Sequence, residues 1–538
     1  MPARTEVAAI RTPSLARLPA WAETLIILAA VLAGWELLAR LALAQSFVLS
    51  APTQIVAQLA DQWPLYVTNV RHTLWTAVRG FVIGNTIAIL AALLVVLAPV
   101  LERPIFSAAL AIYALPMIAL APILMVLLDR ADAMVALSAL AVVFTTLIST
   151  TLGLRSADPA ALGVVHVLGG GRLQQLWRVR LPGSLPAMFA GLRIAAPAAV
   201  LGATVGEFMG AERGLGVLIT GALSGLETNK VWAVAVLATA VSSGAYVLVG
   251  WLGARLTPWV SGLTITQAAD RPAAAGSPGV RTLRLLGLIA LNLIVVFGGW
   301  WLFIRFAGLN AFFAKGPADV WAFLFSAPNA VANRELVFGG LLVTLRNASL
   351  GFVAGMLGGT LAAILFVLRP SIERAVMPVA IALRSIPILA TTPLVILLLG
   401  RGLGATTVIV AILSFFPTMI NMLVGMRMTR RPIVEVLKVL NASRWEVLWR
   451  AELPSALPAL MASARIAVLS SILGAVVIEW LVTGVGMGNA ILAGVYNANY
   501  NVLWAVAAVL TLVAMTAYGL IALAERAVLR RFAPEHLQ

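Results

Sequence analysis

Two glutamates stand inside long apolar segments, and they are the first residues of this sequence that could do chemistry in a hydrophobic environment. Glu207 and Glu479 each precede a Gly-x-Gly segment, which is Gly214–Gly216 for the first and Gly486–Gly488 for the second. An ionisable side chain in an apolar helix is a functional candidate by default. Two interpretations stay open: the glutamates could gate a pathway near the outer ends of two helices, or each could satisfy the backbone of a broken helix or pair with an arginine.

Four other polar residues within apolar segments are candidates for lining a pathway. Arg384 could attract an anion, or its long side chain could reach the nearer membrane surface instead. Tyr113 occupies the position equivalent to Arg384 in an internal repeat described below. Ser149 and Asn421 are weaker candidates, because such side chains in membrane helices often serve only as contacts between helices.

Several kinds of chemistry are missing from the sequence. It has no G-x-x-x-x-G-K-[ST] phosphate loop and no nucleophile elbow, so no catalytic residue is assigned. It has no cysteine, and His72, His166 and His536 lack a metal-ligand spacing. We therefore expect neither a metal site nor a cofactor in this chain.

Two polar loops between apolar segments carry the most specific pattern. Residues 156–182 contain Asp158-Pro159, a favourable helix start, and residues 430–454 contain apolar side chains at helical spacing. Gly169 or Asn441 can end the predicted helix in its own loop. A short amphipathic helix on the inner membrane face is predicted in each loop, and an ordinary connector lying on anionic headgroups is the alternative.

The elements that position these residues are membrane helices. Apolar residues make up 61% of the 538 residues and charged residues 11%, whereas soluble proteins carry about 25% charged residues. The sequence predicts an all-α polytopic protein with about 12 transmembrane helices. The predicted spans are Trp21–Leu43, Thr73–Ala98, Pro104–Leu128, Ala133–Leu154, Leu185–Phe208, Val231–Leu256, Leu285–Phe306, Thr344–Leu368, Ala375–Leu399, Thr406–Met426, Leu457–Leu481 and Val502–Leu523. Prolines 116 and 122, and their equivalents 387 and 393, should kink the third span of each copy.

The chain contains two copies of one unit. Leu181-Pro182 and Glu207 recur as Leu453-Pro454 and Glu479, 272 positions later, and residues upstream recur with an offset of 271. The predicted domains are a first half, residues 1–256, a linker, residues 257–282, and a second half, residues 283–538. Six spans in each half leave the halves in the same orientation, so the two six-helix repeats are parallel.

Charge predicts the orientation. The net charge of +16 comes from Lys and Arg clustered between apolar segments, which follows the positive-inside rule and argues against nucleic-acid binding. Both termini and both polar loops are then cytoplasmic. The apolar run after Arg17 is long for a signal peptide, and we interpret it as a retained first helix in the lipid bilayer.

The polar loops resemble the coupling segment of binding-protein-dependent ABC importer permeases, E-A-A-x-x-x-G followed by I-x-L-P. In the first loop Gly169 and Leu181-Pro182 match the motif, and Gly163 stands at the Glu position. In the second loop Glu435 and Leu453-Pro454 match it, and Asn441 replaces the Gly. Ala-Glu-Arg-Gly-Leu-Gly after Glu207 and Leu-Asn-Ala-Ser-Arg-Trp in the second loop are similar to the nitrate, sulfonate and taurine branch.

This resemblance implies a type I ABC importer permease of the bacterial inner membrane. Its expected partners are two ATP-binding subunits, identical or different, which would hold ATP and Mg, and a periplasmic or lipid-anchored solute-binding protein. The substrate would be a small anionic or zwitterionic solute. The residues expected to couple to the ATPases are Gly163, Gly169, Arg172, Leu181, Pro182, Glu435, Asn441, Arg444, Leu453 and Pro454.

Three points stay open at this level. A fused iron or thiamine permease has the same architecture, and an ion-coupled secondary transporter can also have twelve spans. The two coupling segments should act unequally, because Gly163 weakens the first helix whereas the second keeps an acid, Glu435.

Overall fold

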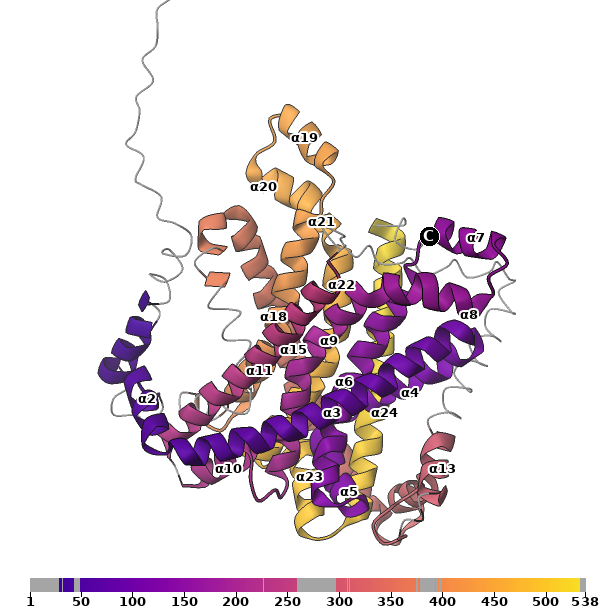
Figure 1. Ribbon diagram of the computed structural model, residues 1–538. Coiled ribbons are helices and arrows are strands. Elements are labelled where there is room, and N and C mark those ends of the chain that lie inside the picture. Colours follow the sequence, from indigo (N-terminus) through magenta and orange to yellow (C-terminus); the bar gives the residue numbers. More distant parts are fainter. Residues whose placement is uncertain are drawn as a thin grey trace, which may run out of the picture.

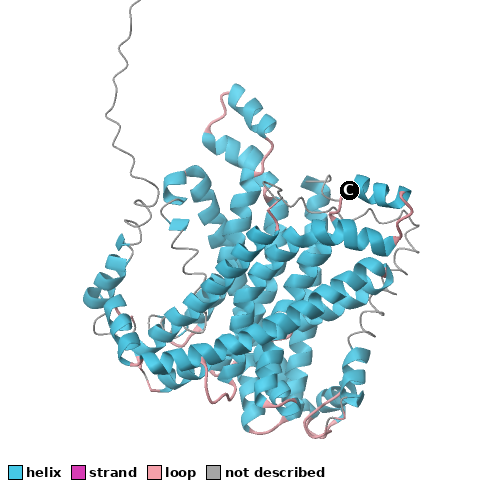
Figure 2. Cartoon of the chain, viewed as in Figure 1, coloured by secondary structure: helices cyan, strands magenta, loops and turns pink. Residues whose placement is uncertain are grey.

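A computed structural model gives the structure of residues 29–42, 49–258, 297–373 and 399–532, except 31, 226, 307 and 309, and of residues 376, 377, 392 and 395. All regular secondary structure in these parts of the chain is helical, as Figure 2 shows. The apolar composition and the helical periodicity of the sequence therefore led to the correct structural class. Residues 259–282 of the predicted linker, and Arg384, lie outside the described residues.

The helices of the first copy follow the order that the sequence predicts. They are α2 (Pro52–Asp61), α3 (Trp63–Leu97), α4 (Glu102–Ala114), α5 (Met117–Leu127), α6 (Arg130–Arg155), α7 (Pro159–Val167), α8 (Arg172–Gln175), η3 (Leu176–Arg180), α9 (Leu181–Phe208), α10 (Leu215–Ser224) and α11 (Thr228–Leu256). The short helix of the polar loop is α7, and α8, η3 and α9 continue it into the membrane.

The second copy repeats this series. Its helices are α13 (Gly299–Phe306), α14 (Pro317–Trp321), η5 (Ala322–Ser326), α15 (Ala330–Leu368), α18 (Leu403–Arg427), α19 (Arg431–Val439), α20 (Arg444–Val447), η6 (Leu448–Glu452), α21 (Leu453–Ser455), α22 (Leu457–Ile478), η7 (Glu479–Thr483), α23 (Gly486–Tyr496) and α24 (Tyr500–Phe532). Helices α15, α18, α19, α22, α23 and α24 correspond to α3, α6, α7, α9, α10 and α11. In Figure 1, α7 and α19 both project from the end of the molecule opposite α5 and α23.

Eight of the described helices are long and apolar enough to cross a membrane, and a bent pair raises the number to nine. Four lie in each copy and match predicted spans. The bent pair is the third predicted span of the first copy, in which α4 and α5 meet at 100°. Pro116 stands at this break, directly before α5, and Pro122 lies inside α5, so the predicted kink in this span is confirmed. The first span of the first copy is described over residues 29–42 except 31, and it includes the π-helix η1 (Leu38–Ala42). Residues 285–296 of the first span of the second copy and most of its third span fall outside the described residues.

Close helix packing builds the centre of each copy. Helix α6 packs against α3 and α9, and α18 packs against α15 and α22 in the same way. A Cβ on Gly84 would lie 2.4 Å from the carbonyl oxygen of Ala139, and a Cβ on Gly355 would lie 2.4 Å from that of Ala411. Small residues therefore let the backbones of these helices approach, as is common where lipid supplies no hydrophobic driving force.

The two copies share one core. A single cluster of buried apolar side chains includes Ile123 and Val205 of the first copy together with Val477 and Val509 of the second. The Phe208 and Trp480 rings, which are equivalent in the repeat, meet edge to face with their centroids 6.3 Å apart. The contact between the copies therefore lies next to Glu207 and Glu479.

Candidate functional site

The polar loop of the first copy forms a capped helix. The Asp158 carboxylate accepts a hydrogen bond from the Ala160 N–H at 2.9 Å at the beginning of α7. At the other end, Gly169 has a φ of 78°, and the Gly170 N–H donates to the Val165 carbonyl at 2.8 Å. This left-handed ending closes the last turn. The start and the end predicted from the sequence are both confirmed.

The polar loop of the second copy reaches the same geometry with a different residue. Asn441 stands at the position of Gly169 and has a φ of 55°, and the Ala442 N–H donates to the Leu437 carbonyl at 2.9 Å. Asparagine is the non-glycine residue that best tolerates this conformation. The departure from the family motif at Asn441 therefore preserves the shape of the turn.

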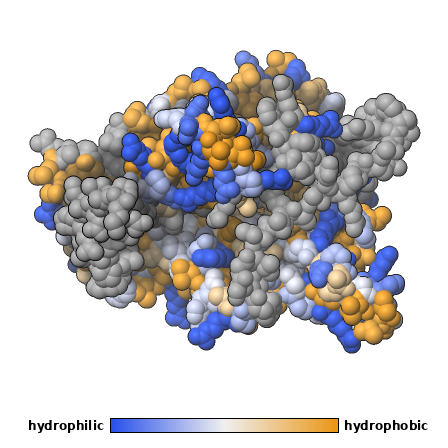
Figure 3. All heavy atoms as spheres, turned by 90° about the horizontal axis from the view of Figure 1, so that it is seen from above, coloured by the Kyte–Doolittle hydropathy of each residue, from blue (hydrophilic) through white to orange (hydrophobic). Residues whose placement is uncertain are grey.

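Both short helices end in exposed apolar side chains. Val167 and Leu168 are 86% and 80% exposed after α7, and Val439 and Leu440 are 83% and 71% exposed after α19. Figure 3, which looks onto this end of the molecule, shows hydrophobic and hydrophilic residues side by side on this face. Projecting apolar side chains surrounded by polar ones are typical of a protein-binding surface. We call these two apolar ends the coupling tips.

Arg444 orders the second coupling segment and attaches it to α15. The Arg444 guanidinium forms an ion pair with Glu452 at 2.7 Å and donates to the Val367 carbonyl at 3.2 Å. A capping box begins α20. The Ser443 hydroxyl accepts from the Glu446 N–H, and the Glu446 carboxylate accepts from the Ser443 N–H at 2.7 Å. That backbone hydrogen bond, together with the Ser443 hydroxyl, keeps the pKa of Glu446 below its usual range. The turn after α19 is thus fixed by charged contacts at both ends of α20.

The first coupling segment lacks this arrangement. Arg180 stands where the second copy has Glu452, and it donates to the Leu154 carbonyl at 3.2 Å. Arg172, the equivalent of Arg444, is exposed and has no ion-pair partner among the described residues. Gly163 lies in the middle of α7, where an added Cβ would meet nothing within 4 Å. The asymmetry predicted at Gly163 and Glu435 therefore extends to the turn that follows each helix.

The Leu-Pro pairs mark where each segment continues into a membrane helix. Leu181 and Pro182 are the first residues of α9, and Leu453 and Pro454 are the first residues of α21. In the first copy the pair lies inside one helix, Arg172–Phe208, where the π-helical turn η3 gives way to α9. In the second copy it follows η6 in the same way, and α21 leads through Ala456 into α22.

Glu207 is buried in a hydrogen-bonded network that joins three elements of the first copy. Its carboxylate accepts from the Thr73 hydroxyl at 3.0 Å and from the Gly216 N–H at 2.9 Å. The same hydroxyl accepts from the Leu215 N–H at 2.9 Å. Asn69 accepts from the Gly214 N–H at 2.6 Å. Helix α3 and Glu207 together satisfy the amides at the beginning of α10, where a Cβ on Gly214 would collide with the glutamate at 2.2 Å.

Glu479 makes the equivalent network in the second copy. Its carboxylate accepts from the Thr344 hydroxyl at 2.6 Å, from the Asn347 amide at 2.9 Å and from the Gly488 N–H at 3.3 Å. The Thr344 hydroxyl accepts from the Met487 N–H at 3.0 Å. A Cβ on Gly486 would lie 2.3 Å from Glu479. This is the geometry of a tie on a broken helix, which is one of the two predicted interpretations.

The two networks differ at one carboxylate oxygen. Glu479 receives the Asn347 amide, whereas the second oxygen of Glu207 faces only His72 Nδ1 at 3.5 Å, with no hydrogen bond. No role was predicted for Thr73 and Thr344. The sequence could have pointed to them, because both residues recur at the same repeat offset as their neighbours.

The remaining pathway candidates lie in separate helix contacts. Tyr113 stacks on Phe144 with ring centroids 4.7 Å apart. Ser149 donates to the Thr145 carbonyl at 2.9 Å, and Asn421 donates to the Ser463 hydroxyl at 3.0 Å. The structure does not gather these three into one site, so their role in a pathway stays a prediction.

The two copies match a known family separately. The family described as binding-protein-dependent transport system inner membrane component matches residues 84–261 and 355–532. The chain belongs to this family. Each matched part contains one coupling segment and one of the two equivalent glutamates, Glu207 or Glu479, so the repeat corresponds to two fused permease domains.

Several curated permeases are similar to this one. It is 33% identical over 265 residues, 48% of this chain and 97% of the relative, to the riboflavin transport system permease protein of Chloroflexus aurantiacus. It is 27% identical over 254 residues, 47% of this chain and 89% of the relative, to the taurine transport system permease protein of Escherichia coli. It is 31% identical over 156 residues, 29% of this chain and 62% of the relative, to the formylaminopyrimidine transport permease protein of Halalkalibacterium halodurans. The resemblance stated from the coupling motifs is therefore confirmed.

Family membership settles the general role of the chain. The permease is a multi-pass inner-membrane component of a binding-protein-dependent ABC transporter, and it is not itself catalytic. A transport system of this kind includes a binding protein and ATPase partners. The contribution of this chain is the membrane-embedded part.

Proposed function

We propose that this permease supplies both halves of the pathway of an ATP-driven importer with a type I fold. The proposal includes about 12 spans in two parallel six-helix repeats. It keeps the predicted domains, which are a first half at 1–256, a linker at 257–282 and a second half at 283–538, and it places both termini in the cytoplasm. Eight candidate spans, the bent pair and the apolar runs outside the described residues support it. The basic loops on the side of α7 and α19 support the orientation.

The coupling tips carry the proposal. Two helices with the same left-handed ending project from one end of the permease and expose apolar side chains there. Separate ATPase subunits, which hold ATP and Mg, would bind one tip each. Closure of the ATPase pair would then move the two membrane halves through α8–α9 and α20–α22, because each coupling segment is continuous with a long helix.

Photo-crosslinking tests this interface. The permease has no cysteine, so Val167→Cys and Val439→Cys can each be labelled with benzophenone maleimide in the complete transporter. Val100→Cys is the matched control, because Val100 is 86% exposed, as Val167 is, but lies in another loop on the same side. We expect both tip variants, and not the control, to crosslink to the ATPase. Equal crosslinking at Val100, or none at either tip, would contradict the proposal.

For the substrate we propose a small anionic or zwitterionic organic solute. Taurine, named in one relative, is zwitterionic, and Arg384 offers a cation within a predicted span. The test measures uptake of the labelled transported solute by proteoliposomes that contain the permease, its ATPases and its binding protein. Unlabelled taurine and unlabelled riboflavin are added separately as competitors. Competition by taurine supports the proposal, and competition by riboflavin alone would replace it with an uncharged class.

A further inference from the structure

A cavity of about 350 Å³ opens on the face opposite the coupling tips. Two loops form it, the one before α14 and the one between α23 and α24. We call it the outer pocket and define it by the residues Phe312, Lys315, Asn497, Asn499, Tyr500 and Asn501. Its size falls within the range of small-molecule sites. The lining combines one cation, three amides and two aromatic rings, with no carboxylate.

Lys315 supplies the positive charge of the outer pocket. Its ammonium donates to the Ala311 carbonyl at 2.7 Å, and it forms no ion pair among the described residues. An ammonium has three N–H donors, so further donors stay available to a ligand. The nearest acid along the chain is Asp319, whose carboxylate accepts from the Gly316 N–H at 2.7 Å. Lys315 is therefore a half-buried cation whose charge no neighbouring acid balances.

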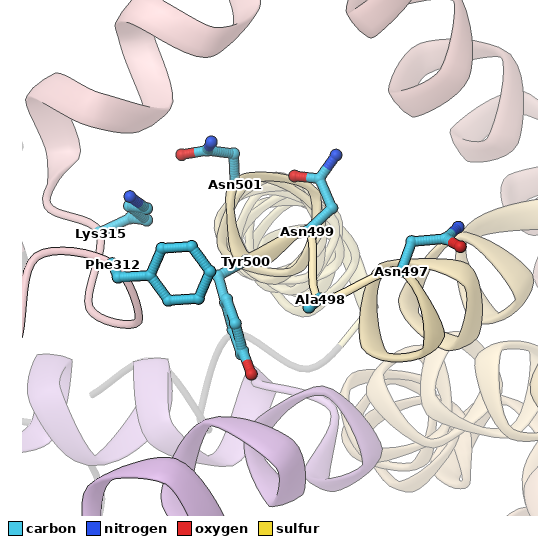
Figure 4. Close-up of a pocket in the computed structure, with 7 residues that line it drawn as sticks. All are labelled: Phe312, Lys315, Asn497, Ala498, Asn499, Tyr500 and Asn501. Carbon is cyan, nitrogen blue, oxygen red and sulfur yellow. The ribbon is translucent and has the colours of Figure 1, made fainter.

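The asparagines lie where α24 begins. In Figure 4 the Asn499 and Asn501 amides project to one side of this helix, away from the Tyr500 hydroxyl. Asn499 also accepts from the Val502 N–H at 3.4 Å, in the first turn of α24. The preceding residue, Ala498, has a φ of 50°, a conformation that is unfavourable for a residue with a Cβ. The loop thus holds its amides in place at a local backbone cost.

The equivalent corner of the first copy is held by contacts between its polar side chains. Both corners contain a pair of tryptophan rings with centroids 5.5 Å apart. Ser50 and Lys315 each stand two residues before the proline that begins the next helix. Ser50 donates to Asn229, the equivalent of Asn501, at 2.8 Å. Lys230 in that corner pairs with Glu227 at 3.0 Å. Among the described residues, Lys315 and Asn501, which stand at the positions of Ser50 and Asn229, form no such hydrogen bond with each other.

We propose that the outer pocket of the second copy binds an oxyanion, the phosphate, sulfonate or carboxylate group of a small molecule. Lys315 would supply the charge, and Asn499 and Asn501 would supply neutral donors to the remaining oxygens. The first turn of α24 adds a favourable dipole. The Phe312 and Tyr500 rings contact each other and line one side of the pocket. The oxyanion can come from a free solute or from an anionic lipid headgroup, because the pocket lies at the membrane surface.

Cysteine protection tests the proposal in the purified permease. Ala498→Cys places a thiol in the lining of the pocket, and the absence of native cysteine makes its labelling specific. The measured quantity is the rate of reaction with a neutral methanethiosulfonate in nanodiscs of phosphatidylcholine. Inorganic phosphate is compared with chloride at the same ionic strength. A second set of nanodiscs contains phosphatidylglycerol without phosphate.

We expect phosphate or phosphatidylglycerol to slow labelling of the Ala498→Cys variant at least threefold. Slowing by phosphate indicates that the oxyanion comes from a free solute, and slowing by phosphatidylglycerol indicates that it comes from a lipid headgroup. Lys315→Gln should abolish the protection, which is measured as the ratio of the labelling rates with and without the anion in the same variant. Lys230→Gln, which removes the paired lysine of the first copy, is the matched control and should keep the protection. Equal rates in all conditions, or equal protection in the Lys315→Gln variant, would overturn the proposal.

Discussion

Replacing Glu479 separates the two interpretations of the buried glutamates. Leucine is close to glutamate in size but accepts no hydrogen bond. In Glu479→Leu the Thr344 hydroxyl can still donate to the Gly340 carbonyl, at 3.1 Å, whereas the Asn347 amide and the Gly488 N–H lose their acceptor. Two buried donors without partners cost about 1–3 kcal/mol each, or about 2–6 kcal/mol together.

Glutamine keeps the acceptor and removes the charge. In Glu479→Gln the amide oxygen can accept from Thr344 and Gly488, and the Asn347 side chain can rotate its amide to present oxygen to the new N–H₂ group. We therefore expect the Gln variant to fold with nearly the stability of the unchanged protein. The same holds for Glu207→Gln, in which the new amide can donate to His72 Nδ1.

The assay combines apparent melting temperature with uptake. One kcal/mol shifts the midpoint by about 2–4 °C in a domain of 150–250 residues. We thus expect Glu479→Leu to melt at least about 4 °C lower, and Glu479→Gln to retain both melting temperature and transport. A normal melting temperature for the Glu479→Leu variant would refute the interpretation that Glu479 holds the broken helix together. It is also refuted if the Gln variant melts normally but no longer transports, because a charge-dependent gate would behave in that way.

Three other predictions concern the coupling segments. Glu435→Ala should lower substrate-stimulated ATP hydrolysis on the order of tenfold, if a charge-assisted hydrogen bond is lost in the ATPase cleft. Gly163→Ala should be neutral or stabilise α7 by about 1 kcal/mol, and equal effects of these two changes would remove the asymmetry. Arg444→Gln should reduce stimulated hydrolysis by leaving Glu452 unpaired, and adding Glu452→Gln should restore part of it; additive losses would show that the ion pair is not what matters. A cysteine at Ser156 should react with an impermeant reagent only from the cytoplasmic side, and labelling in intact cells would reverse the predicted orientation.

The sequence by itself determined the class of the protein, its repeat and the ends of its short helices. These features depend on local signals: the length of an apolar run, a cap such as Asp158, or a residue that tolerates positive φ. Gly169 and Asn441 show this most clearly, because each ends its helix where the sequence predicts. The family motif was recognisable in both copies for the same reason, since it occupies one continuous loop.

The tertiary structure decided what each polar side chain contacts. Thr73 and Thr344 approach their glutamates from 134 and 135 positions away, a pairing that no local pattern reveals. Pro116 stands at the break between α4 and α5 whereas Pro122 lies within α5, and the sequence alone does not show which of the two prolines marks the break, because membrane helices can contain proline. Lys315 and Asn501 likewise became a candidate site only when the fold brought their two loops together. Spacing in sequence fixes helix faces and ends, but the choice of partner depends on how the helices pack in three dimensions.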